Sequence, residues 1–270
     1  MTFRAWLPLL LALLVSAPAR AETPEQAYTA ALGALHKGAD NDAIDRLELL
    51  ADQGFVNPDA SLARAAAYLS RAEGSSARPG DLGRAAAALS ETLLLRPNDA
   101  QAERALEAVQ GEIARRKSRQ AESVMVRPRL GRAIAALLPE QLWAALALLG
   151  SLVLAVGIVV RRLTTRGLPH LTGAVAIGVG VALLTGFGAG TYAAFRYRTT
   201  SRPAVVVVPE ARLTNETGRP LPYKAGADST TVPEGATLYV KEQREGRCLV
   251  EWGNTDGWLS SSDVRLLGGS

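Results

Sequence analysis

Residues suited to catalysis or metal binding are scarce in this chain. It has one cysteine, Cys248, and two histidines, His36 and His170, which lie far apart in the sequence. One cysteine cannot form an internal disulfide, and two distant histidines supply neither a histidine-based metal site nor a catalytic triad. The carboxylates are expected on solvated helix faces, where nothing shifts a pKa toward catalysis. We therefore predict a non-enzymatic protein without cofactor or metal, and we assign no catalytic, metal-binding or partner-binding residue.

Charged residues are absent from two long stretches, residues 142–160 and residues 171–195. A helix rises about 1.5 Å per residue, so each stretch is long enough to cross a hydrocarbon core of about 30 Å. A buried helical hairpin in a soluble protein is the alternative, but soluble core helices seldom stay uncharged for so long. The sequence therefore predicts two transmembrane helices, and the lack of charge within them is not typical of a transporter or a proton relay.

Small residues recur at every fourth position of both stretches. Such stripes allow helix backbones to approach closely in lipid. We predict that they pack against the other helix of the hairpin or against a partner, although small residues are common throughout this chain. The residues are Ala147, Ser151 and Ala155 in the first stretch, and Gly178, Ala182, Gly186, Gly190 and Ala194 in the second.

The first 21 residues have the pattern of a cleavable signal peptide. Arg4 precedes an apolar run, and small residues at Ala19 and Ala21 suit a signal peptidase. Cleavage after Ala21 would place both soluble segments outside the cytoplasm and the arginine-bearing loop 161–170 inside it. Arginines also flank the outer ends of the two stretches, so charge counting alone does not fix the orientation. An uncleaved first helix would place both segments in the cytoplasm.

The segment before the membrane, residues 22–118, is predicted to be helical throughout because apolar residues return at intervals of three and four. Two helix pairs are expected, with capping residues at Asp40–Asp42, small residues at the helix crossings, and Pro97 ending the second pair. The spacing between Ala43 and Ala85 matches the tetratricopeptide period if residues 72–79 are an inserted loop. An ordinary helical bundle would share this pattern. The basic run at residues 114–119 is interpreted as a solvated helix end, and we predict no nucleic-acid partner.

The segment after the membrane, residues 196–270, changes to short β-type runs separated by Gly, Pro and Asn. Residues 253–257 predict a hairpin turn, and alternation predicts that Cys248 lies on the inner face of a strand. The Gly257-Trp258 pair and the final run 264–267 resemble bacterial SH3-like domains, which implies a small β-barrel. The aromatic residues of this segment are predicted to pack mainly in the core rather than to form a binding surface. They are Tyr223, Tyr239, Trp252 and Trp258.

Four motifs in the helical segment resemble the tetratricopeptide region of the BatE family, a component of bacterial aerotolerance operons. The inserted loop and the sequence Arg64-Ala65-Ala66 depart from the family pattern. The resemblance implies a function in oxidative-stress tolerance or envelope integrity, with partners among Bat proteins that carry von Willebrand factor A domains and, indirectly, a MoxR-type ATPase. The motifs are Pro58-Asp59, Ala67-Tyr68, Gly80 to Ala85, and Pro97 to Ala100.

Together these features predict an inner-membrane adaptor of mixed α and β architecture, with both soluble domains in the periplasm. The alternative is an envelope sensor that binds peptidoglycan through the SH3-like domain, and a weaker one is an accessory subunit of an enzyme complex. The predicted parts, in chain order, are a signal peptide (1–21), tetratricopeptide-like repeats (22–118), a juxtamembrane linker (119–141), a transmembrane helix (142–160), a cytoplasmic loop (161–170), a second transmembrane helix (171–195) and an SH3-like β-barrel (196–270).

Overall fold

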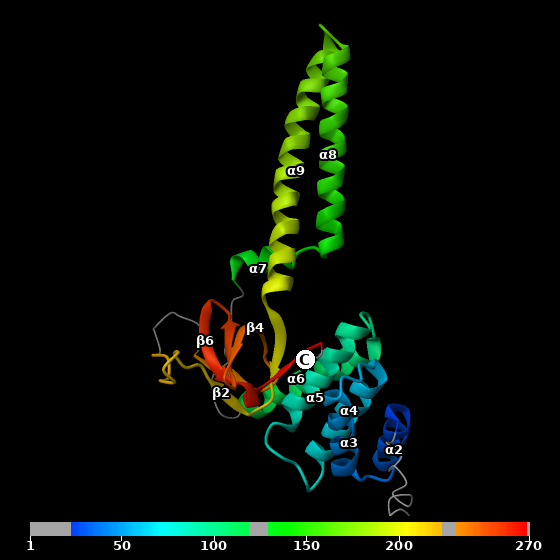
Figure 1. Cartoon of the computed structure of the whole chain (residues 1–270), viewed down its shortest axis with the longest axis vertical. Coiled ribbons are helices and arrows are strands. Elements are labelled where there is room, and N and C mark those ends of the chain that lie inside the picture. The colour runs from blue at the N-terminus through cyan, green and yellow to red at the C-terminus, as the bar shows by residue number, and fades with distance from the viewer. Residues whose placement is uncertain (1–22, 119–128, 223–229, 269–270) are drawn as a thin grey trace, which may run out of the picture.

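The computed structural model describes residues 23–118, 129–222 and 230–268. This part of the chain is mostly helical, with a small antiparallel sheet near the C-terminus and two long apolar helices (Figure 1). The predicted signal peptide and Tyr223 lie outside the described residues. The mixed α and β architecture is therefore confirmed, whereas the tetratricopeptide and SH3-like identities stay predictions.

The helices that precede the hairpin in the sequence stack as antiparallel neighbours. Alanines lie at their crossings, and Ala43 and Ala85, which the sequence analysis matched to each other, are both fully buried. Small side chains at these points let the helix axes approach closely, as expected from the sequence. The helices are α2 (Pro24–His36), α3 (Asp40–Asp52), α4 (Pro58–Glu73), α5 (Asp81–Leu95) and α6 (Ala100–Ser118).

The ends of these helices follow local chemistry. Thr23 and Gln26 form a capping box at the start of α2, and Asn57 caps α4. The prediction of capping side chains at Asp40–Asp42 is wrong, because the N-cap of α3 is Ala39, whose methyl group cannot accept a hydrogen bond. Asp40 instead lies in the first turn and accepts a hydrogen bond of 2.9 Å from Ser70 Oγ.

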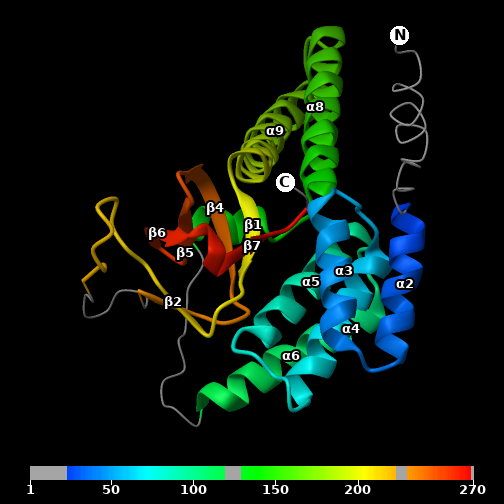
Figure 2. The same ribbon diagram turned by 60° about the horizontal axis from the view of Figure 1, so that its bottom comes forward.

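Two long helices form an antiparallel hairpin that stands away from the rest of the molecule (Figures 1 and 2). They are α8 (Glu140–Leu163) and α9 (Leu168–Thr200), and both are long and apolar enough to cross a membrane. Each extends beyond the stretch predicted for it, so that residues 164–167 alone connect them. A short helix, α7 (Leu130–Ala135), precedes α8 in the segment predicted as a linker and lies across the foot of the hairpin (Figure 1).

Of the three glycines predicted at the contact between α8 and α9, only Gly190 lies there, where an added Cβ would meet the ring of Trp143. The other contact glycines were not predicted. A Cβ added at Gly157 would lie 2.8 Å from Ile177 N, and one added at Gly180 would lie 2.5 Å from Leu154 N. At Gly178 and Gly186, by contrast, no atom of the described chain lies within 4 Å of an added Cβ. Within each helix, two contact glycines are seven residues apart: Gly150 and Gly157 in α8, and Gly173 and Gly180 in α9. This heptad spacing is typical of helices that pair at a small crossing angle.

The sheet has strand order β6-β5-β4-β1-β7, and β2 pairs with β3 beside it. The predicted turn joins β5 to β6, with Gly253 at a φ of 58°, and Cys248 is buried on the inner face of β5 as expected. The strands are β1 (Arg202–Val206), β2 (Glu210–Arg212), β3 (Thr231–Pro233), β4 (Thr237–Arg244), β5 (Arg247–Trp252), β6 (Thr255–Ser260) and β7 (Val264–Leu266).

The sheet packs directly on the stacked helices. Val205 of β1 and Val207 after it share one hydrophobic cluster with Leu82, Ala86 and Leu89 of α5. A Cβ on Gly83 would meet the Val206 carbonyl oxygen at 2.7 Å, so the α5 backbone lies almost against the strand. Elements more than a hundred residues apart in the sequence thus bury one another, and the apolar hairpin lies between them in the chain.

Candidate functional site

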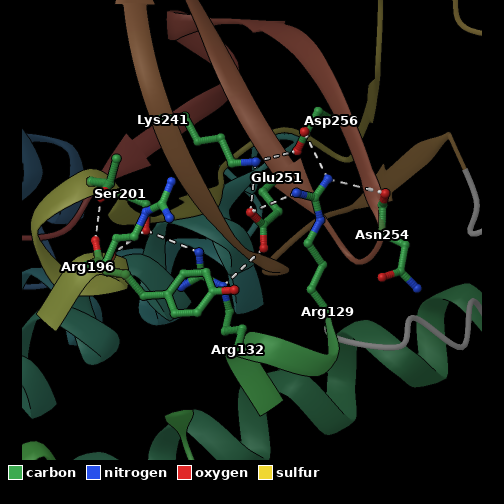
Figure 3. A network of polar contacts seen from close by, with 10 residues as sticks. Arg129, Arg132, Arg196, Ser201, Lys241, Glu251, Asn254 and Asp256 are labelled. Atoms are coloured by element: carbon green, nitrogen blue, oxygen red, sulfur yellow. Dashed lines mark hydrogen bonds and ion pairs between the residues drawn. The ribbon is translucent and has the colours of Figure 1, made fainter. Parts of the chain in front are cut away.

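The most elaborate polar cluster lies where the sheet meets the foot of the hairpin. At its centre is Glu251 of β5, which is only 3% exposed. Its carboxylate lies 3.1 Å from Arg132 Nε and 2.9 Å from Lys241 Nζ, and it forms an ion pair with each (Figure 3). Arg129 Nη1 lies 3.8 Å from the same carboxylate. Asp256 extends the cluster by pairing with Arg129 at 2.9 Å and with Lys241 at 2.8 Å. We call these residues the juxtamembrane clamp: Arg129, Arg132, Lys241, Glu251 and Asp256.

Strand pairing places the acidic half of the clamp. Glu251 is directly opposite Tyr239 of β4 on one side and Asp256 of β6 on the other. Side chains directly opposite across paired strands lie on the same face of a sheet. Lys241 lies where the register of β4 shifts, between Val240 and Glu242, and its ammonium group contacts both carboxylates. Strand register and this irregularity bring two carboxylates, one ammonium group and one aromatic ring together.

The two arginines of the clamp come from α7 and from its N-cap, Arg129. Arg132 inserts its guanidinium between two aromatic rings, 4.6 Å from the ring centre of Tyr197 in α9 and 3.5 Å from that of Tyr239. Its Nη2 donates to Ser201 Oγ at 3.1 Å, where α9 passes into β1. Cation–π contacts and charge-assisted hydrogen bonds are strongest where water is excluded. Arg132 thus connects α7, α9 and the sheet through a single side chain.

Charge complementarity keeps the clamp ionised. Burial alone raises the pKa of Glu251, but hydrogen bonds from Lys241 and Arg132 and their positive charges outweigh it, so the pKa lies below its usual value. The same balance, with Lys241 and Arg129 as partners, lowers the pKa of Asp256. The carboxylates are therefore held as anions, which is suited to structural attachment and not to general acid catalysis.

A second polar cluster joins the sheet to the stacked helices. Arg265 of β7 lies 3.2 Å from Glu48 Oε2 and 3.3 Å from Asp52 Oδ1, both on α3. Arg64 of α4, which is almost fully buried, lies 3.7 Å from Glu48 and also pairs with Glu91. A cleft of about 240 Å³ opens beside these groups. Each arginine in this cleft already has a carboxylate partner. The cluster is therefore better suited to holding the sheet against the helices than to binding a ligand.

A third pair is buried inside the helical unit. Arg71 donates to both carboxylate oxygens of Asp81, at 2.5 Å and 3.1 Å, and Asp81 is 1% exposed. The expectation that carboxylates lie on solvated faces is therefore wrong for Asp81 and Glu251. Both are buried because arginines brought by other elements neutralise them.

The aromatic residues of the sheet lie largely in its interior, as predicted for most of them. Trp252 and Trp258 are 9% and 8% exposed, and Arg132 covers the ring of Tyr239. The described residues therefore present no aromatic groove of the kind that binds proline-rich peptides.

Sequence reasoning missed the juxtamembrane clamp. The alternation of β5 places Glu251 opposite the core face, where solvent is the default expectation. The only local signal was the pair Arg129 and Arg132, three residues apart just before an apolar stretch, a spacing that puts both on one side of a helix.

Comparison of the chain with protein-family models, curated proteins and solved structures gives no match. Among the described residues, no group of three or more His, Cys, Asp and Glu side chains is placed to hold a metal ion. What the described site can do physically is to hold the sheet, α7 and the hairpin in one fixed arrangement.

Proposed function

We propose that this protein is a non-enzymatic membrane adaptor that holds a helical-repeat unit and a small β unit on the same side of a bilayer. Anchoring through α8 and α9, with both soluble units in the periplasm, is part of this proposal. The tetratricopeptide-like identity of the helices and the SH3-like identity of the sheet belong to it as well.

One observation carries the proposal: the contacts from hairpin to sheet to helices are continuous and well packed. Arg132 of α7 joins the hairpin to the sheet because it contacts both Tyr197 of α9 and Glu251 of β5. The contact of Gly83 with Val206 joins the sheet to α5. A hydrophobic cluster shared by α5 and β1 adds a nonpolar interface. Such continuity is what a presenting scaffold requires, because it fixes the position of a binding surface relative to the membrane.

The resemblance to the BatE family suggests the kind of partner. Stacked helix pairs bind segments of other proteins on an extended surface. We propose that the helical unit binds membrane proteins with von Willebrand factor A domains, in a complex linked to oxidative-stress tolerance and envelope integrity. This step depends on family analogy.

Peptidoglycan binding by the sheet is less well supported. Carbohydrate recognition commonly uses exposed aromatic rings, but Trp252 and Trp258 are buried and Tyr239 is covered. A pull-down with purified sacculi distinguishes the two functions, since an adaptor should remain in solution.

Topology is tested by labelling intact cells with a membrane-impermeant maleimide. Single cysteines are placed at Leu94 in α5, Gln243 in β4 and Arg166 in the hairpin turn, in a Cys248→Ala background. We expect labelling at positions 94 and 243 but not at 166 until the membrane is opened. Labelling of 94 and 243 from opposite sides would contradict the proposal.

Partner binding is tested by co-expressing the intact chain with a membrane protein that carries a von Willebrand factor A domain. The adaptor function predicts a stoichiometric complex after detergent extraction and gel filtration. A matched membrane protein without that domain is the control. Equal recovery of both proteins, or of neither, would count against the proposed partner class.

A further inference from the structure

We infer that α7 and the turn after it form an anchor in the interfacial layer of the bilayer, with leucine and isoleucine side chains among the lipid headgroups. This inference rests on the proposed membrane insertion of α8 and α9. It adds a second contact with lipid, parallel to the membrane surface.

The first observation is a cluster of exposed apolar side chains. Outside α8 and α9, the described residues include six strongly exposed large hydrophobic side chains, and three of them lie within one short segment. These three are Leu130, Ile134 and Leu137, at 76%, 43% and 73% exposed. The others lie singly on the helical unit. Scattered apolar residues are ordinary on a soluble surface, whereas a local cluster marks an interaction site.

The second observation is amphipathicity. Leu130 and Ile134 are four residues apart, which places both on one face of α7, and Leu137 lies in the turn that follows the helix. The other side of the segment carries Arg129 and Arg132, which bind the sheet, and Ala135, which is buried. The segment therefore has one side that binds the protein and one apolar side that the described residues leave largely exposed, as in helices that lie in a membrane interface.

The third observation fixes the level of α7 along the hairpin. α8 begins only a few residues after α7, and Trp143 Nε1 of α8 donates to the Ala135 carbonyl at 3.3 Å. At the same foot, Arg198 of α9 pairs with Glu140 of α8 at 3.1 Å. Charged side chains at the ends of apolar helices are typical of the boundary between hydrocarbon and water. Figure 1 shows α7 lying across the foot of the hairpin.

A bilayer is the occupant that these observations favour over a protein. The apolar cluster is continuous with helices long enough to cross a membrane, and exposed Arg196 and Arg198 lie at the same foot, where headgroup phosphates would be. Because Arg132 leaves the same helix to hold Glu251, an anchored α7 would also fix the tilt of the sheet relative to the membrane.

Nitroxide scanning of the intact chain in phosphatidylcholine nanodiscs tests this inference. Single cysteines replace Leu130, Leu137, Leu94 and Val156 in a Cys248→Ala background, and collision rates with oxygen and with a water-soluble nickel chelate are measured. All four positions are at least half exposed, so the label should be tolerated. Leu94, on the helical unit, is the control for water, and Val156, within α8, is the control for lipid.

We expect the labels at positions 130 and 137 to meet the nickel chelate several-fold less often than the label at 94, and to meet oxygen more often. Nickel access equal to that at 94, with 156 protected, would overturn the interfacial anchor and leave the spanning hairpin intact. Protection from both reagents at 130 and 137 would mean that protein covers this face, which also overturns it. Nickel access at 156 as well would contradict the membrane insertion itself.

Discussion

The backbone amide of Gly83 in α5 donates a hydrogen bond of 2.7 Å to Oε1 of Glu234, 151 positions later, directly after β3. This contact can form only because Gly83 has no side chain. A Cβ at this position would lie 2.7 Å from the Val206 carbonyl oxygen and 2.8 Å from Glu234 Cγ. The helical unit and the sheet are therefore joined at a point where two backbones nearly touch, and that point can be tested with a single methyl group.

Gly83→Ala is expected to weaken the contact between the helical unit and the sheet. The added methyl group must displace backbone, which costs about 1–3 kcal/mol in a well-packed core. The matched control is Gly111→Ala in α6, where no atom of the described chain lies within 4 Å of the new Cβ. That variant should be neutral or more stable, because alanine favours a helix by roughly 0.5–1 kcal/mol over glycine. Chemical denaturation of the two proteins in detergent decides the matter, and equal midpoints would contradict the close approach.

The carboxyl of Glu234 is expected to make this interface weaker at neutral pH than in mild acid. Burial raises its pKa above the usual value of 4.5, and the hydrogen bond from Gly83 only partly opposes that effect. A raised folded-state pKa contributes stability that is complete below the unfolded value and is lost as the pH rises through the folded value. Glu234→Gln keeps the acceptor for Gly83 and removes the charge. Between pH 4 and pH 8, the free energy of unfolding of the parent should therefore fall, and that of the variant should not. Denaturation of both proteins at several pH values in this range measures the difference.

The clamp at the foot of the hairpin has the opposite pH dependence. The pKa of Glu251 is lowered, so its contribution is complete above the unfolded value of 4.5 and is lost as the pH falls through the lower folded value. Glu251→Gln should lose about 1–3 kcal/mol at neutral pH, since the buried donors that face it keep only a neutral partner. It should also lose less stability than the parent below pH 4.5, because Asp256, whose pKa is lowered as well, still contributes an acid-induced loss. Tryptophan fluorescence of the sheet, followed against denaturant at several pH values, measures both effects, and parallel curves for parent and variant would contradict the clamp.

Patterns that depend on neighbours in sequence predicted most of the local structure. The uncharged stretches became long helices, the Gly253 turn joined β5 to β6, and alternation placed Cys248 inside the sheet. Each of these features follows from periodicity or turn chemistry within about ten residues.

Contacts between distant elements were not predictable in the same way. Glu251 sits on the outward face of its strand, and only the packing of α7, more than a hundred positions earlier, buries it. Asp81 has the sequence position of a first-turn acid on a solvated helix. In the structure it is buried and paired with Arg71 of the neighbouring helix. A charged side chain is buried only where it has a partner of opposite charge. Because that partner comes from another element of the fold, the local sequence pattern does not predict it.

The glycines of the hairpin provide the sharpest test of a corrected prediction. Every-fourth-residue spacing predicted Gly178, Gly186 and Gly190 on the contact face, and Gly190 does meet Trp143 of α8. Gly180, which was not predicted, lies so close to α8 that an added Cβ would be 2.5 Å from Leu154 N. An added Cβ at Gly178 has no described atom within 4 Å outside the backbone of its own helix. Gly180→Ala should therefore force α8 and α9 apart, which costs about 1–3 kcal/mol as overpacking. Gly178→Ala, two residues away in the same helix, should not.

Thermal unfolding of the detergent-solubilised variants measures this difference. A loss of 1 kcal/mol corresponds to roughly 2–4 °C for a protein of this size class, so Gly180→Ala should melt several degrees below the parent and Gly178→Ala at or above it. Gly186→Ala, which also has no described atom within 4 Å of its new Cβ, is a second control. If Gly178→Ala and Gly186→Ala were the damaging pair and Gly180→Ala were silent, the helices would meet through the four-residue stripe after all. The heptad arrangement of glycines would then be wrong.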